Sequence, residues 1–208
     1  MEGGGCVEIA VNGIDGAGKS TFIEKLEVRL REEGISVAVI DCPYFRRTKG
    51  FSRASPVLER VGNQAERFSR ILFGGYMFCV VLLYWLARWR TRGVEVLLVE
   101  HHPHIDLVPY AQMYGARIGV WFARRIRHFW PEPDGVILLT VSPEESVRRI
   151  QVRGRPRQWR QTTSRLNALQ ELMRDIVKEN SCWVHNGCMT AEELITLIQQ
   201  QKVIGRTG

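Results

Sequence analysis

The sequence predicts an α/β fold: a central parallel sheet of five strands with helices on both faces. Three observations favour it. Several short runs are nearly continuous in aliphatic residues, as in parallel strands that are covered on both faces. Stretches with helical spacing alternate with these runs, and such alternation produces right-handed crossovers. The length of 208 residues suits one compact domain over residues 1–208.

The strands are expected in this order: residues 7–13, 35–41, 94–100, 134–141 and 182–185. The helix after the first strand begins in GKST, has Leu26 and Leu30 at helical spacing and stops at Gly34. Another helix begins at Ser142, where S-P-E-E forms a capping box with proline at the first helical position. In such a sheet the functional site lies at the carboxyl ends of the strands.

The stretch ILFGGYMFCVVLLYWLA, residues 71–87, carries no formal charge. It is at the short end of what crosses a bilayer, about 17 to 25 residues. It contains two glycines, arginines flank it, and a strand follows within a few residues. We therefore expect a buried helix that could also serve as a dimer contact, with a membrane span as the less favoured alternative.

Composition excludes some classes of protein. A hydrophobic content of 45% and a charged content of 25% are ordinary globular values, which argues against disorder or a fibrous repeat. Five cysteines without a C-x-x-C pair argue against a disulfide framework or a zinc ribbon and favour a reducing, cytoplasmic setting. The net charge of +7 is mostly arginine, which suits anionic small molecules or nucleic acid.

The residues GIDGAGKST lie between the first strand and its helix and match the pattern G-x-x-x-x-G-K-S. In this P-loop, backbone amides cradle a polyphosphate, the lysine reaches the terminal phosphates and the serine gives an oxygen to Mg²⁺. A chance glycine-rich turn is disfavoured, because both flanking elements are present. We expect a P-loop NTPase fold with ATP and Mg²⁺ as ligands, the phosphates contacting Gly13, Asp15, Gly16, Ala17, Gly18, Lys19, Ser20 and Thr21.

The strand VEVLLVE ends in Glu100, which would lie beside this loop. There its carboxylate can hold the metal ion, with Ser20, or orient an acceptor. Histidines follow, so a metal cluster is an alternative, built from Glu100, His101, His102, His104 and His128. We favour the first interpretation, because adjacent residues in an extended segment point to opposite sides.

The segment RGRPRQWRQTTSR, residues 153–165, is rich in arginine and interrupted by glycine and proline. We expect a short mobile lid that excludes water and brings guanidinium groups to the charge that develops during phosphoryl transfer. Its arginines are Arg153, Arg155, Arg157, Arg160 and Arg165. Arg155 is the first candidate for the catalytic one. A solvated basic surface and a nucleic-acid groove are the alternatives.

These motifs resemble the thymidylate kinase family of P-loop nucleoside monophosphate kinases. The resemblance implies that Asp15 binds the sugar 3′-hydroxyl of the acceptor. ILFGG is similar to the family's L-L-F-A-A, whose phenylalanine, Phe73 here, stacks on thymine. EHHP looks like its D-R-Y/H segment, which puts His101 at the acceptor. Residues 133–155 resemble the family's fourth strand, the helix after it and the start of its arginine-bearing lid, and Gly16 implies that the catalytic arginine comes from that lid.

Three arginines of the family's acceptor side are replaced. The phosphate-binding arginine of R-E-P-G corresponds to Asp41 in DCPY. Met77 replaces the arginine that reads the thymine edge, and His101 replaces the arginine of D-R-Y. Candidates for substitution follow the second strand: Arg46, Arg47 and Arg53.

The resemblance implies ATP-dependent conversion of dTMP to dTDP by a homodimer, with Lys19, Arg155 and Glu100 as catalytic residues. Neither a membrane nor nucleic acid is then expected as a partner. Two alternatives stay open. One is a kinase of the same architecture that phosphorylates a nucleoside or another small metabolite, which the missing arginines favour. The other is a P-loop protein that binds nucleic acid and uses ATP as a switch.

Overall fold

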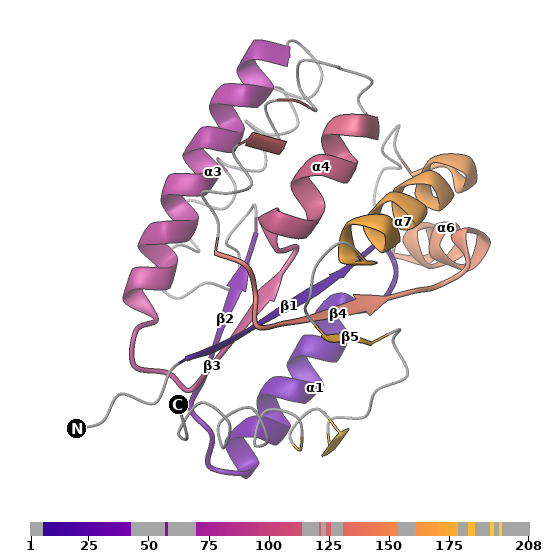
Figure 1. The fold of residues 1–208 in the computed structure, drawn as a ribbon. Helices are drawn as coiled ribbons and strands as arrows, with labels where there is room; N and C mark the ends of the chain where they lie inside the picture. The colour runs from indigo at the N-terminus through magenta and orange to yellow at the C-terminus, as the bar shows by residue number, and fades with distance from the viewer. Residues whose placement is uncertain are drawn as a thin grey trace.

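A parallel sheet runs through the centre of the molecule, with helices on both of its faces (Figure 1). The computed structural model describes residues 6–42, 57, 70–113, 121, 124–125, 131–153, 161–178, 183–185, 192–193 and 196. Everything said below of the structure concerns these residues. The strand order is β2-β3-β1-β4-β5, and every pairing is parallel. The predicted α/β class and parallel sheet are confirmed.

The body of the sheet consists of four strands rather than five equal ones. They are β1 (Val7–Gly13), β2 (Val37–Asp41), β3 (Val96–Glu100) and β4 (Gly135–Leu139). The remaining segment, β5 (Trp183–His185), has three residues and pairs along the outer edge of β4. β1 is central, so the loop that follows it opens in the middle of the carboxyl edge.

Helix α1 (Lys19–Glu32) covers one face of the sheet, where Ile23, Leu26 and Leu30 pack against odd-numbered residues of β1. The opposite face is covered by three helices: α3 (Arg70–Arg90), α4 (Pro103–Met113) and α7 (Thr163–Lys178). Helix α6 (Pro143–Val152) joins this second layer through Ile150. The even-numbered residues of β1 therefore face α3 and α4.

The Ser142 half of the capping box predicted at the start of α6 is confirmed, whereas the Glu145 carboxylate accepts from Arg148 and Arg149. Ser142 has extended backbone geometry and its Oγ accepts a hydrogen bond from the Glu145 amide at 3.2 Å, while Pro143 occupies the first turn. This cap fixes where α6 begins, directly beyond β4. It thereby sets which α6 side chains lie against the loop after β1.

Helix α3 differs from the buried helix expected over residues 71–87. It extends from Arg70 to Arg90, and over residues 79–90, whose side chains are described, one side enters the core through Val80 and Tyr84. Its other side exposes large apolar side chains: Leu82, Trp85, Leu86 and Trp89. No helix in the described ranges is both long and apolar enough to cross a membrane.

Strand register brings polar residues together at the carboxyl edge. Glu100 pairs with Val11 of β1 on one side and with Asp41 of β2 on the other, and Gly13 pairs with Leu139 of β4. The loop after β1 therefore lies between the tips of β3 and β4. This is the edge at which the sequence predicted the functional site.

Candidate active site

The loop between β1 and α1 packs closely against its surroundings. A Cβ atom on Gly13 would lie 2.4 Å from the Leu139 carbonyl oxygen, so this position accepts no side chain. Gly16 has a φ of +84°, and a Cβ there would lie 2.9 Å from the Ser146 carbonyl oxygen. Both glycines are needed for the backbone to curl between β4 and α6.

The start of α1 concentrates positive charge inside this curl. Gly18 is the N-cap residue, and no side chain caps the helix. The buried Lys19 turns back over the loop, with its Nζ 2.9 Å from the carbonyl oxygens of both Gly13 and Ile14. Helix amides and an ammonium group thus surround one small volume, which is the arrangement that binds polyphosphates.

Two oxygen ligands meet beside the lysine. Ser20 Oγ donates a hydrogen bond to Glu100 Oε1 at 2.8 Å, although 80 residues separate them in sequence. Glu100 is only 5% exposed at the tip of β3, whereas Ser20 is exposed on α1. A hydroxyl and a carboxylate at hydrogen-bond distance are hard oxygen donors of the kind Mg²⁺ prefers.

Side chains of α6, and one from the residues just before α7, contact the loop. Ser146 Oγ donates to the Asp15 carbonyl oxygen, and Arg149 Nη1 donates to the Gly16 carbonyl oxygen at 3.2 Å. Gln161, just before α7, donates from Nε2 to Asp15 Oδ2 at 3.0 Å. The sequence alone did not indicate any of these three contacts. Ser146 and Arg149 are three apart on α6, a spacing that could have indicated a shared inner face.

The three neighbouring histidines diverge. His101 has a φ of +57°, and its Nδ1 lies 2.6 Å from Asp106 Oδ2. The buried His102 accepts the His104 amide at Nδ1 and so caps the first turn of α4. His104 is buried, with its Nε2 3.9 Å from Glu132 Oε1.

Within the described residues no group of three or more metal-binding side chains converges. The metal-cluster alternative is therefore wrong for Glu100, His101, His102 and His104. Its fifth candidate, His128, lies outside the described residues. The histidines diverge because the chain turns sharply at the positive φ of His101 and then enters a helix.

A buried carboxylate lies beneath the site. Glu8 of β1 accepts hydrogen bonds from the Tyr84 hydroxyl, from His102 Nε2 at 3.0 Å and from Arg88 Nε at 2.8 Å. Burial raises the pKa of Glu8, but these contacts lower it by more, so the net shift is downward. A glutamate in a strand covered on both faces signals such partners, because a buried charge must be paired.

Similarity to known proteins identifies the family of this chain. The model of the family described as "Thymidylate kinase" matches residues 11–201. The chain belongs to the thymidylate kinase family. A thymidylate kinase of Xylella fastidiosa is 28% identical over 79% of this chain and 75% of its own. A probable thymidylate kinase of Sulfurisphaera tokodaii is 26% identical over 68% of this chain and 67% of its own. A thymidylate kinase of Mycobacterium tuberculosis is 26% identical over 65% of this chain and 66% of its own.

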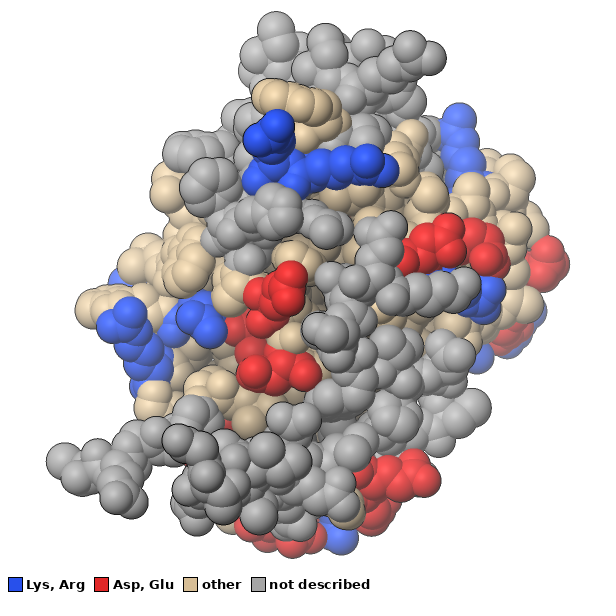
Figure 2. All heavy atoms as spheres, viewed as in Figure 1, with Lys and Arg blue, Asp and Glu red and all other residues tan. Residues whose placement is uncertain are grey.

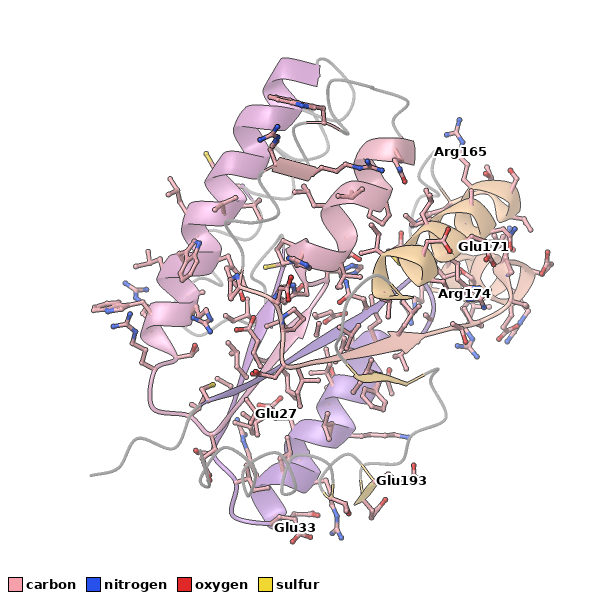
Figure 3. The ribbon with its side chains drawn as sticks, in the orientation of Figure 1. Glu27, Glu33, Arg165, Glu171, Arg174 and Glu193 are labelled. Atoms are coloured by element: carbon pink, nitrogen blue, oxygen red, sulfur yellow. The ribbon has the colours of Figure 1, made fainter. Side chains whose placement is uncertain are left out.

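The other site residues predicted from the sequence lie at several places in this thymidylate kinase family member. Asp41 is 9% exposed beside Glu100, Ala17 is half-buried, and Thr21 is exposed on α1. Arg153 is exposed at the end of α6, and Arg165 projects outward from the start of α7 (Figure 3). Outside the described residues or side chains lie Arg46, Arg47, Arg53, Phe73, Met77, Arg155, Arg157 and Arg160.

Proposed function

We propose that this protein transfers the γ-phosphoryl group of ATP to a nucleotide acceptor, converting dTMP to dTDP. The observation that carries the proposal is the P-loop itself: an α1 N-terminus that no side chain caps, with Lys19 folded over it and the Ser20–Glu100 pair at its side. Membership of the thymidylate kinase family and the names of the relatives support the choice of acceptor.

The donor side works by positioning and electrostatics, which supply most of the catalysis in phosphoryl transfer. The loop amides and Lys19 hold the phosphates of ATP. Ser146 and Arg149 hold the carbonyl groups of Asp15 and Gly16 toward α6. Because these contacts hold the loop in place, little reorganisation is needed when charge develops on the transferred group.

The Ser20–Glu100 pair fits a magnesium ion in its donor atoms. Both groups offer oxygen, and they come from the two elements that border the phosphate site. When bound, Mg²⁺ neutralises phosphate charge. Ser20 would contact the ion directly, and Glu100 would hold it directly or through water.

On the acceptor side, Asp15 would contact the sugar hydroxyl, Phe73 the base and His101 the acceptor phosphate. Gln161 holds one oxygen of the Asp15 carboxylate, which sets the direction of that side chain. We assign stabilisation of the transferring phosphoryl group to the lid arginines, with Arg155 first. Arg153, Arg157 and Arg160 are the further candidates.

The Lys19→Ala variant tests the donor site, measured with a coupled assay of ATP consumption across a panel of nucleosides and monophosphates. We expect loss of transfer with an unchanged circular dichroism spectrum. Lys25→Ala is the matched control, because Lys25 is an exposed lysine of the same helix. Turnover that persists without Lys19 would contradict the proposal.

A second candidate function, phosphorylation of a nucleoside, is favoured by two replaced residues of the acceptor side. Asp41 and His101 stand where the resembled family has arginines that bind the acceptor phosphate. Comparing thymidine with dTMP as acceptors in the same assay separates the two functions. Preference for thymidine would make the nucleoside the substrate.

Binding of nucleic acid receives less support from the charges. On the face drawn in Figure 2, acidic and basic side chains of the described residues are interspersed, without a continuous basic stripe. Affinity for nucleic acid that relies on phosphate contacts falls steeply with salt. A salt titration with single-stranded DNA therefore tests this alternative.

We also propose that the exposed side of α3 is the contact of a homodimer. Leu82, Trp85, Leu86 and Trp89 recur at helical spacing and are 41 to 58% exposed. Leu86→Arg should give monomers in sedimentation while leaving the fold intact, because the side chain lies outside the core. Val28→Arg on α1, where valine is 57% exposed, is the control and should leave the assembly unchanged.

A further inference from the structure

A chain of hydrogen bonds leads from the core to the His101 ring. Asp106 Oδ2 lies 2.6 Å from His101 Nδ1, and Asp106 Oδ1 accepts from Asn12 Nδ2 at 2.6 Å. Asn12 Oδ1 in turn accepts the His102 amide at 3.3 Å. Asn12 is fully buried and Asp106 is 6% exposed, while the His101 side chain is 20% exposed. The chain thus runs from rigid, dry positions to a ring at the carboxyl edge of the sheet.

The chemistry of these groups fixes the direction of each hydrogen bond. A carboxylate only accepts, so the Nδ1 atom of His101 carries the hydrogen that points at Asp106. Asn12 cannot turn its amide around, because its oxygen already accepts from the His102 amide and its nitrogen must face Asp106. The ring nitrogen of His101 that remains for a ligand is therefore Nε2.

The backbone of His101 is also held in place. A φ of +57° is uncommon for a residue other than glycine, and here the His101 amide donates to the Val11 carbonyl oxygen at 3.2 Å. Asn12 Nδ2 adds a contact of 3.4 Å to the carbonyl oxygen of the next residue, His102. Such a conformation persists where surrounding contacts enforce it, and these positions concentrate in functional sites.

We propose that Asp106, itself held by Asn12, is a positioning residue that presents Nε2 of His101 to the acceptor nucleotide and so determines acceptor affinity. The inference rests on the proposed function, in which His101 contacts the acceptor. It assigns a role to two residues, Asp106 and Asn12, that the sequence motifs did not indicate. Neither of them touches the substrate; both act through the ring.

A purely structural role makes a different prediction. If Asp106 and Asn12 only fasten α4 to β1, then altering Asp106 affects the enzyme equally whether or not the His101 ring is present. If Asp106 acts through the ring, its effect disappears once the ring is removed. A double-mutant cycle separates these two cases.

The cycle compares wild type, Asp106→Asn, His101→Ala and the double variant, with dTMP and ATP varied separately. The asparagine replaces one acceptor oxygen by a donor, which then faces either Asn12 Nδ2 or His101 Nδ1. We expect Asp106→Asn to raise the KM for dTMP about tenfold or more, the cost of a lost hydrogen bond to a charged group, with the KM for ATP unchanged. In the His101→Ala background the same change should leave the KM for dTMP unaltered.

Tyr84→Phe is the matched control. Its hydroxyl lies 3.4 Å from His102 Nε2, on the core side of the same turn, so the variant should lower stability without changing the KM for dTMP. An equal effect of Asp106→Asn in both backgrounds would overturn the proposal. So would an equal rise in the KM for ATP.

Nuclear magnetic resonance of the His101 ring nitrogens tests positioning without turnover. In the wild-type protein Nδ1 should be protonated, and adding dTMP should shift the Nε2 signal more than the Nδ1 signal. An unprotonated Nδ1, or a larger shift at Nδ1, overturns the positioning role. Protonated Nδ1 in a protein that neither binds nor phosphorylates dTMP would support the positioning and refute only the proposed function.

Discussion

Replacing Glu8 by glutamine tests the energetics of the buried network beneath the site. The carboxylate accepts three hydrogen bonds, from Tyr84, His102 and Arg88, and all come from side chains far along the sequence. Glutamine has nearly the same shape but only one acceptor atom, so at least one donor must face its amide group. The variant therefore removes charge and pairing while leaving the packing nearly unchanged.

The magnitude follows from the kind of bond that is lost. Hydrogen bonds to a charged group contribute about 1.5–3 kcal/mol each and neutral ones about 0.5–1.5, so the two buried donors each lose roughly 1 kcal/mol. The Arg88 side chain is 36% exposed, so solvent screens its ion pair and we count only about 0.5 kcal/mol for it. The expected loss in the free energy of unfolding is about 2–3 kcal/mol at neutral pH.

The loss should depend on pH with a defined sign. The pKa of Glu8 is lowered below its usual 4.5 in the folded protein, so the charged form is favoured by folding. The stability that it contributes is fully present above that value and is lost as the pH falls through the folded pKa. The difference between wild type and Glu8→Gln should therefore shrink below about pH 4.5.

Urea denaturation of both proteins at neutral pH and at progressively lower pH, at fixed ionic strength, measures this difference. Glu171→Gln is the control, because Glu171 forms an exposed ion pair with Arg174 on α7 (Figure 3). Exposed pairs contribute about 0–1 kcal/mol, so little change is expected there. Equal stability of Glu8→Gln and wild type at neutral pH would refute the reasoning, as would a difference that does not depend on pH.

Three further predictions concern the loop, the cysteines and α6. Gly16→Ala should weaken ATP binding in calorimetry and cost at least about 1 kcal/mol of stability, because φ is +84° and the new Cβ would lie 2.9 Å from a backbone oxygen of α6. Burial raises the pKa of the Cys42 thiol well above its usual value, so mass spectrometry after brief alkylation should find Cys6 and Cys79 modified and Cys42 intact. Ser142→Ala should lower the free energy of unfolding by about 1 kcal/mol in urea titrations, since its hydroxyl caps α6.

The P-loop could be predicted because all of its determinants are local. A strand, a glycine-rich turn and a helix start lie within about twenty residues, and the motif constrains their geometry. Glu100 could also be placed, because it ends a buried strand and parallel strands end at one edge. The Ser20–Glu100 contact follows from these two facts together.

The contacts that join the P-loop and β1 to later parts of the chain could not be predicted, because they depend on how the helices pack on the sheet. Gln161 reaches Asp15 across 146 residues, and the Asn12–Asp106 pair joins β1 to α4 across 94. The strand sequence VEIAVNG, residues 7–13, gave a partial indication of such contacts. Glu8 and Asn12 lie four apart in a buried strand and therefore point to the same face, where polar partners were required.

The pairing of β2 with β3 has a consequence for how the nucleotide enters. Asp41 and Glu100 are register partners at adjacent strand tips, and both are almost completely buried. Two carboxylates of like sign in a poorly hydrated corner repel a bare polyphosphate. We therefore expect metal-free ATP to bind more weakly than MgATP, which calorimetry with and without Mg²⁺ can measure.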